Sequence, residues 1–202
     1  KVDRCFRDYS KYVRRDEIFV MRGNYVCIII MNTIKCMMES SDGEDLDVFL
    51  HRKHYKPIIE GGQSELHNRA IMYVIQPNFE DQNIYKVGIA AGQDMAKKRL
   101  TDYLLAYGVK SETNPNKGAK IFLVLYTKFE PRTQISRTMI RQLEARLKKE
   151  LIANGKKDRG NEWFNVPIAE LLTTIHSFLR LKEDCPDPDD DIPLAERYAR
   201  KR

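Results

Sequence analysis

A tyrosine, an arginine and a glutamate in the central part of this 202-residue sequence have the chemistry needed to act on a phosphate ester. Tyr73 lies in the apolar stretch "IMYVI", Arg99 in "DMAKKRLTDYLLAYG" and Glu144 in "RQLEARLKKEL". Cleavage of a phosphodiester requires an activated water, relief of the negative charge on the phosphate, and help for the departing oxygen. A phenol, a guanidinium and a metal-bound carboxylate can supply these functions.

Each of these residue types has its own task in such a site. Glu144 is expected to hold Mg²⁺ or Mn²⁺, because a hard cation takes oxygen ligands and shares its shell with phosphate and water. Arg99 would bind phosphate oxygens with its planar fork. Tyr73 would orient or deprotonate the attacking water, which requires a lowered pKa that nearby Lys86 or Arg99 could provide. Glu150, on the same predicted helix as Glu144, is a competing metal ligand.

Alternating strands and helices must position these residues. The expected elements, in order, are a hairpin at 71–90, a helix at 94–108, a strand at 119–129, an amphipathic helix at 134–155, a short extended piece at 162–167 and a closing helix that begins near Pro167. Asp94 is available to cap the first helix and Gly108 to end it. The order predicts an α+β fold, with a small central antiparallel sheet flanked by helices.

The regions on either side differ in composition. Residues 1–66 contain the strand-like stretches "NYVCIIIMN", "IKCMMES" and "LDVFLHR", which predict a β-rich extension whose first two strands form a hairpin. Gly61-Gly62 break this pattern before the central domain at 67–181. Residues 182–202 combine the acidic "EDCPDPDDD" with a basic end, which is typical of a loosely packed tail.

Composition limits the class of protein. Hydrophobic residues make up 42% and charged residues 32% of the chain, as in globular proteins, and no apolar run has the ~20 residues of a membrane-spanning helix. No membrane partner is therefore expected. The four cysteines form no CxxC pair, which favours incidental thiols and an intracellular location, in the cytoplasm or nucleus of a host cell. His51 and His54 form an HxxH pattern without a third ligand and are expected on the surface.

Positive charge is concentrated in the region of the predicted amphipathic helix. The net charge is +6, and nine Lys or Arg residues occur between Arg132 and Arg159. A charged helix face is most often merely solvated, and nucleic-acid binding is the alternative. The residues that would then contact a phosphate backbone are Arg137, Arg141, Lys148, Lys156, Lys157 and Arg159.

Taken in order, these motifs resemble those of the GIY-YIG nuclease superfamily over about residues 70–180. "IMY", "YKVG", the helix arginine, the helix glutamate and "NEWFNV" follow the family's order, and "YKVG" and "EWF" are similar to the phage and large-virus branch. The resemblance implies that Tyr73 and Arg99 are catalytic and that Glu144 binds a metal. It also implies supporting roles for Tyr103, where many members have histidine, and for Asn165.

The second motif departs from the family pattern by one residue. The family's tyrosine stands two positions before the glycine, where this chain has Lys86, while Tyr85 is one step earlier. Successive side chains of a strand point to opposite faces, so Tyr85 would point away from a site that Lys86 faces unless a bulge intervenes. Lys86 would then take the tyrosine's place.

These observations predict a metal-dependent endonuclease acting on DNA, with Mg²⁺ or Mn²⁺ as cofactor. A homodimer would let one type of site cut both strands of a duplex. One alternative is a catalytically inactive nuclease-like module that binds nucleic acid or protein, because fold does not fix function. Another is a structural component of a larger assembly that docks through its terminal segments.

Overall fold

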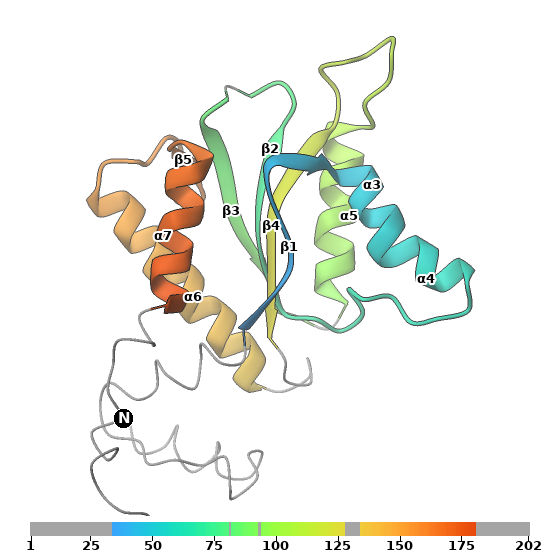
Figure 1. Cartoon of the computed structure of the whole chain (residues 1–202), viewed down its shortest axis with the longest axis horizontal. Coiled ribbons are helices and arrows are strands. Elements are labelled where there is room, and N and C mark those ends of the chain that lie inside the picture. The colour runs from blue at the N-terminus through green and yellow to red at the C-terminus, as the bar shows by residue number, and fades with distance from the viewer. Residues whose placement is uncertain (1–33, 81, 93, 128–133, 181–202) are drawn as a thin grey trace, which may run out of the picture.

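The computed structural model describes residues 34–80, 82–92, 94–127 and 134–180, which form one antiparallel sheet with helices on both faces (Figure 1). The strands follow the spatial order β1-β4-β2-β3-β5. Their bounds are β1 Ile34–Asp45, β2 Ile71–Pro77, β3 Ile84–Ala90, β4 Ala119–Thr127 and β5 Trp163–Asn165. This arrangement confirms the predicted α+β fold.

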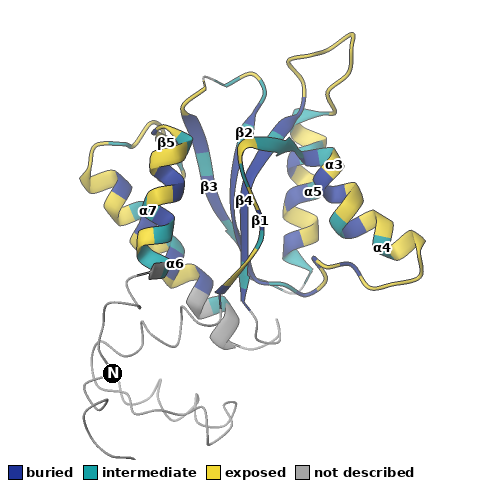
Figure 2. Cartoon of the chain, viewed as in Figure 1, coloured by how far each residue is buried: buried dark blue, intermediate teal, exposed yellow. Residues whose placement is uncertain are grey.

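The helices divide between the two faces of the sheet. The short helices α3 Leu46–Leu50 and α4 Lys56–Ile59, joined by the π-helical turn His51–Tyr55, lie on the same side as α5 Met95–Tyr107, whereas α6 Gln134–Ala153 and α7 Ile168–Arg180 lie on the other (Figure 1). The central strands β2, β3 and β4 are mostly buried (Figure 2). Each face therefore has its own hydrophobic core.

We call these the α5-side core and the α6-side core. The α5-side core includes Phe49, Ile71, Tyr73, Leu100 and Tyr103. The α6-side core includes Tyr85, Phe122, Leu143, Leu147 and Phe164. The β2–β3 hairpin contributes alternate residues to both cores, as strand geometry requires.

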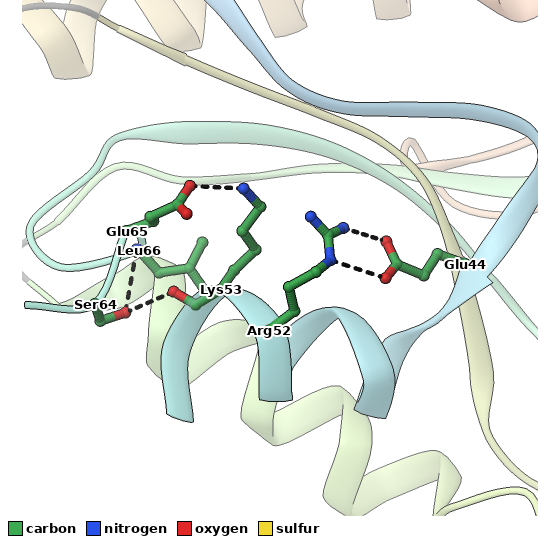
Figure 3. Close-up of polar contacts among 6 residues, drawn as sticks. All are labelled: Glu44, Arg52, Lys53, Ser64, Glu65 and Leu66. Atoms are coloured by element: carbon green, nitrogen blue, oxygen red, sulfur yellow. Dashed lines mark hydrogen bonds and ion pairs between the residues drawn. The ribbon is translucent and has the colours of Figure 1, made fainter. Parts of the chain in front are cut away.

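The predicted third strand at "LDVFLHR" is wrong, because this segment is helical. Leu46, Phe49 and Leu50 are spaced so that one side of α3 faces the α5-side core, and all three are buried. Side-chain pairs then hold this region in place (Figure 3): Arg52 forms an ion pair with Glu44 at 2.6 Å, and Lys53 forms one with Glu65 at 2.7 Å. The Ser64 hydroxyl also donates a hydrogen bond to the Lys53 carbonyl and accepts one from the Leu66 N–H.

Within residues 34–66, β1 adds an edge strand to the sheet. β1 pairs with β4 along its length, with two register shifts. The segment "NYVCIIIMN" of the predicted hairpin and the tail at 182–202 lie outside the described residues. Among the residues that the structure describes, no helix has the length and apolar character needed to cross a membrane.

Two local predictions next to α5 are corrected. Asp94 adopts a left-handed conformation with φ 52° and makes no side-chain cap, and its carboxylate instead lies 3.1 Å from Nδ1 of His67. His54 is buried rather than on the surface, with its Nδ1 2.7 Å from Ser64 Oγ. His51 is exposed as expected.

Candidate active site

A pocket of about 330 Å³ opens where the edge of β3 is left uncovered. β5 pairs only with Ile84, Tyr85 and Lys86, so β3 continues past its outer neighbour. Side chains from α5, α6 and the segment before β5 meet beyond that point. The lining residues are Tyr73, Gly88, Ile89, Arg99, Tyr103, Glu144, Lys148 and Glu162. Four predicted site residues, Tyr73, Arg99, Tyr103 and Glu144, thus line one pocket.

Tyr73 lies at the inner end of this pocket and packs directly over Gly88. The two residues are cross-strand partners, and the Tyr73 side chain is almost fully buried. A β-carbon on residue 88 would stand 2.5 Å from the Tyr73 hydroxyl oxygen, a separation that real β-carbons do not reach. The glycine of "YKVG" is therefore required here for a steric reason, since the phenol ring occupies the space of a side chain.

The pKa of Tyr73 is shifted in the opposite direction from the one that its predicted role as a base needs. Burial raises the pKa of Tyr73 far above its ordinary value, and the neighbouring Tyr103, whose hydroxyl lies 3.0 Å away, raises it further. Arg99 acts in the opposite direction but does not outweigh burial. Tyr73 therefore stays protonated at neutral pH in this structure, which suits a hydrogen-bond donor better than a base.

Lys86 faces the α5 side, as strand alternation predicted. Its Nζ lies 3.1 Å from Oε2 of Glu162 and 5.1 Å and 5.5 Å from the ring centroids of Tyr103 and Trp163. Burial lowers the pKa of Lys86, but the hydrogen bond to Tyr103 and the pairing with Glu162 outweigh burial, so the net shift is upward. Lys86 thus joins the tyrosines to Glu162 as a cation.

Tyr85 and Asn165 lie outside the pocket. Tyr85 packs in the α6-side core, where its ring is 5.1 Å from that of Phe122 and its hydroxyl donates to the Gln82 carbonyl at 2.6 Å. The pairing of β2 with β3 has no register shift, so no bulge returns Tyr85 to the site. Asn165 is exposed on β5, and its backbone N–H donates to the Lys156 carbonyl.

An ion-pair chain closes the other side of the pocket. Lys148 Nζ lies 2.6 Å from Oε1 of Glu144 and 3.8 Å from Oε1 of Glu162, and the Glu144 and Lys148 side chains are only 14% and 16% exposed. Burial raises the pKa of Glu162, but its hydrogen bond to Lys86 and the charges of Lys86 and Lys148 produce a net decrease. The competing Glu150 is exposed and accepts a hydrogen bond from Asn154 instead.

Glu162 lines the pocket, which was not predicted from the sequence. In the sequence this residue was noted only as part of the "EWF" motif. Two observations reveal its role: Val87 N–H donates to the Glu162 carbonyl at 2.8 Å, and its carboxylate pairs with Lys86. The pairing of β5 with β3 places Glu162 there. Such long-range pairing has no local sequence signal.

Glu144 and Glu162 are the carboxylates among the residues that line the pocket. Among the described residues, no cluster of three or more His, Cys, Asp or Glu side chains has the arrangement of a metal site. Mg²⁺, however, is often held by one or two carboxylates and completes its shell with water and substrate phosphate. Glu144 already holds a cation, the Lys148 ammonium, inside the pocket. Glu144 is the pocket carboxylate that would hold Mg²⁺ or Mn²⁺, and the ion would compete with Lys148 for it.

The predicted phosphate-contacting residues have different surroundings. Lys148 belongs to the pocket, Lys156 pairs with Glu170 on α7, and Arg159 pairs with Glu80 in the β2–β3 loop and stacks 4.2 Å over the Trp163 ring. The remaining residues are exposed Arg141 and Lys157 and half-buried Arg137. Much of the basic character of this region is thus already balanced by carboxylates.

The five-stranded antiparallel sheet and its flanking helices are consistent with a small nuclease-like fold. The chain belongs to the T5orf172 domain family, whose model matches residues 70–179. The match extends from the start of β2 to the last turn of α7 and leaves out β1, α3 and α4. No curated protein and no solved structure matches the chain.

Proposed function

We propose that this protein is a metal-dependent endonuclease that hydrolyses phosphodiester bonds in DNA. The observation that carries the proposal is the convergence of Tyr73, Arg99 and Glu144, from β2, α5 and α6, on one pocket. A phenol, a guanidinium and a partly buried carboxylate are the groups that phosphodiester cleavage uses. The similarity of "YKVG" and "EWF" to the phage and large-virus branch agrees with this assignment.

Each residue has a task that follows from its surroundings. Arg99 is exposed at the pocket and binds the phosphate oxygens through its planar fork. Glu144 holds Mg²⁺ or Mn²⁺, which when bound supplies positive charge for the phosphate and its departing oxygen. Tyr73, being protonated, donates a hydrogen bond that orients the attacking water. Glu162 is ionised at neutral pH and lines the pocket as a carboxylate that accepts a hydrogen bond from the attacking water, whose proton passes to solvent.

The test is nicking of supercoiled plasmid, with Mg²⁺ or Mn²⁺ against a chelator. We expect Glu144→Gln, which keeps the shape and removes the charge, to lower the nicking rate by about 100-fold or more. Glu150→Gln on the same helix is the matched control and is expected to cut at the wild-type rate, because Glu150 lies outside the pocket. Loss of activity in Glu150→Gln alone would instead make Glu150 the ligand.

A second candidate is a nuclease-like module that binds nucleic acid without cutting it. Two observations favour this alternative: the Tyr85 side chain lies in the α6-side core, and burial raises the pKa of Tyr73. Metal-independent binding of DNA, without nicking under either metal, would support the binding module and reject the enzyme. Plasmid nicking and a DNA-binding measurement together therefore separate the two candidates.

A further inference from the structure

Four aromatic rings form a continuous row that leads from the pocket to the surface. Tyr73 and Tyr103 have ring centroids 5.8 Å apart, Tyr103 and Tyr107 stack nearly parallel at 5.7 Å, and Tyr107 meets Phe79 edge-on at 5.8 Å. We call these residues the aromatic row. Its rings come from β2, α5 and the β2–β3 loop.

Exposure increases along the aromatic row in one direction. Tyr73 is 1% exposed and Tyr103 9%, Tyr107 is half-buried, and Phe79 at the outer end is 61% exposed. The inner rings have the ordinary role of core packing. A largely solvated phenylalanine in a loop gains little from packing, because most of its apolar surface remains in water. The outer rings are therefore available to a ligand.

A second aromatic surface faces the row across Lys86. The Arg159 guanidinium lies 4.2 Å over the Trp163 ring and is held there by its ion pair with Glu80, in the same loop as Phe79. Lys86 Nζ is within 5.5 Å of the ring centroids of both Tyr103 and Trp163. Flat rings and cations thus alternate around the approach to the pocket.

The loop that carries Phe79 is anchored beside further positive charge. Asn78 N–H donates to the Gly118 carbonyl at 2.9 Å, and its side-chain amide donates to the Lys117 carbonyl at 2.6 Å. Lys110 and Lys117 are both exposed in this neighbouring loop. Aromatic faces that accept bases, next to lysines that accept phosphates, are the features of proteins that hold single-stranded nucleic acid.

We propose that the outer rings of the aromatic row, Tyr107 and Phe79, and the stacked Arg159–Trp163 pair hold unpaired nucleotides beside the pocket. This inference rests on the proposed function and gives its substrate class: DNA with a single-stranded segment next to the bond that is cut. In a duplex each base is covered by its stacked neighbours, whereas an unpaired base offers its whole face to a ring such as Phe79.

Binding in the presence of chelator tests this inference separately from cleavage. The probes are a short fluorescent oligothymidylate, a duplex of the same length and an oligouridylate, measured by anisotropy at one salt concentration, because backbone binding depends strongly on salt. We expect the full chain to bind oligothymidylate about 10-fold more tightly than duplex. Phe79→Ala should remove about 5- to 10-fold of that affinity and change duplex binding less than about 2-fold.

Two variants control for folding and for a general loss of surface rings. Phe79→Tyr keeps an aromatic face and is expected to bind oligothymidylate like wild type. Tyr55→Ala removes a 38% exposed ring that lies outside both the pocket and the aromatic row, and should leave binding unchanged. An equal effect of Phe79→Ala on single-stranded and duplex probes would overturn the inference.

The possible outcomes separate this inference from the proposed function. Equal affinity for oligothymidylate and duplex, with metal-dependent nicking intact, would overturn the inference alone. A single-strand preference without any cleavage would overturn the enzyme and leave the aromatic row as a binding surface. Tighter binding of oligouridylate than of oligothymidylate would overturn the assignment of DNA as the substrate. Binding of none of the three probes, together with no nicking under either metal, would overturn both proposals.

Discussion

The two tyrosines of the β2–β3 hairpin are close in sequence and belong to opposite sides of the molecule. Tyr73 lines the pocket and shares a hydrogen bond with Tyr103, whereas Tyr85 packs on Phe122 and fixes its own turn through the Gln82 carbonyl. Both are buried. Tyr85 stands one residue before Lys86 on β3, and this single step places its side chain in the α6-side core instead of beside Tyr103.

The position that Tyr85 vacates belongs to Lys86. A lysine there brings a positive charge to the hydroxyl of Tyr103 and to the carboxylate of Glu162. A tyrosine at position 86 would be a neutral hydrogen-bond donor at neutral pH. The hydroxyl of Tyr73 is thus hydrogen-bonded to that of Tyr103, which in turn contacts the Lys86 ammonium. The predictions below test whether the Tyr73 and Tyr85 hydroxyls differ in function as they do in position.

The largest expected difference is in catalysis. Tyr73→Phe should lower the metal-dependent nicking rate by about 100-fold, because it removes the hydroxyl at the reacting end of the pocket. Tyr85→Phe should leave that rate within about 2-fold of wild type, since its hydroxyl lies in the other core. Plasmid nicking under identical metal concentrations measures both. Equal losses of nicking rate in the two variants would show that the pocket position of the Tyr73 hydroxyl has no special role in catalysis.

The steric dependence of Tyr73 on Gly88 gives the next effect. Gly88→Ala should lower the free energy of unfolding by about 1–3 kcal/mol, because the added carbon overlaps the phenol ring. Urea unfolding measures this loss. In a double-mutant cycle with Tyr73→Ala the two losses should be less than additive, since removing the ring relieves the overlap. If the two losses of stability added exactly, the strain caused by Gly88→Ala would not come from contact with the Tyr73 ring.

The hydrogen bond of Tyr85 predicts a smaller change in stability. Tyr85→Phe should lower the free energy of unfolding by about 1 kcal/mol, since the Gln82 carbonyl loses its donor. Urea unfolding at neutral pH measures this change. An unchanged midpoint would mean that water replaces the hydroxyl without loss, and would weaken the view that Tyr85 serves to hold the β2–β3 turn.

The smallest effect concerns the acid side of the stability curve. The pKa of Glu162 is lower in the folded protein than its ordinary value of 4.5, so its stabilising contribution is present above about pH 4.5 and disappears as pH falls through the folded value. Glu162→Gln should therefore flatten the loss of stability in acid. Thermal unfolding from neutral to acid pH, in chelator, measures this. Glu112→Gln, an exposed loop variant, should keep the wild-type curve.

The sequence predicted those features that depend on local periodicity. Alternation along β3 separated Tyr85 from Lys86, and the four-residue spacing of Leu143, Leu147 and Leu151 identified the buried face of α6. The segment 46–50 was misassigned because a short apolar run fits a strand and a helix equally well.

Properties set by distant parts of the chain could not be predicted. The raised pKa of Tyr73 arises because α5 covers β2, and His54 is buried because Ser64 returns to meet it. Glu162 reaches the pocket only through the pairing of β5 with β3. Each depends on tertiary contacts between segments whose local sequences are unremarkable.

Both edges of the sheet carry features that oppose pairing with another sheet. Exposed strand edges invite another sheet to pair with them, and proteins counter this with short, irregular or charged edge strands. Here β1 has two register shifts and carries Glu39 and Glu44, and β5 is only a three-residue strand. The gap beyond β5 is lined by charged side chains, which oppose the addition of another strand there. A site at a sheet edge therefore need not make the chain prone to aggregation.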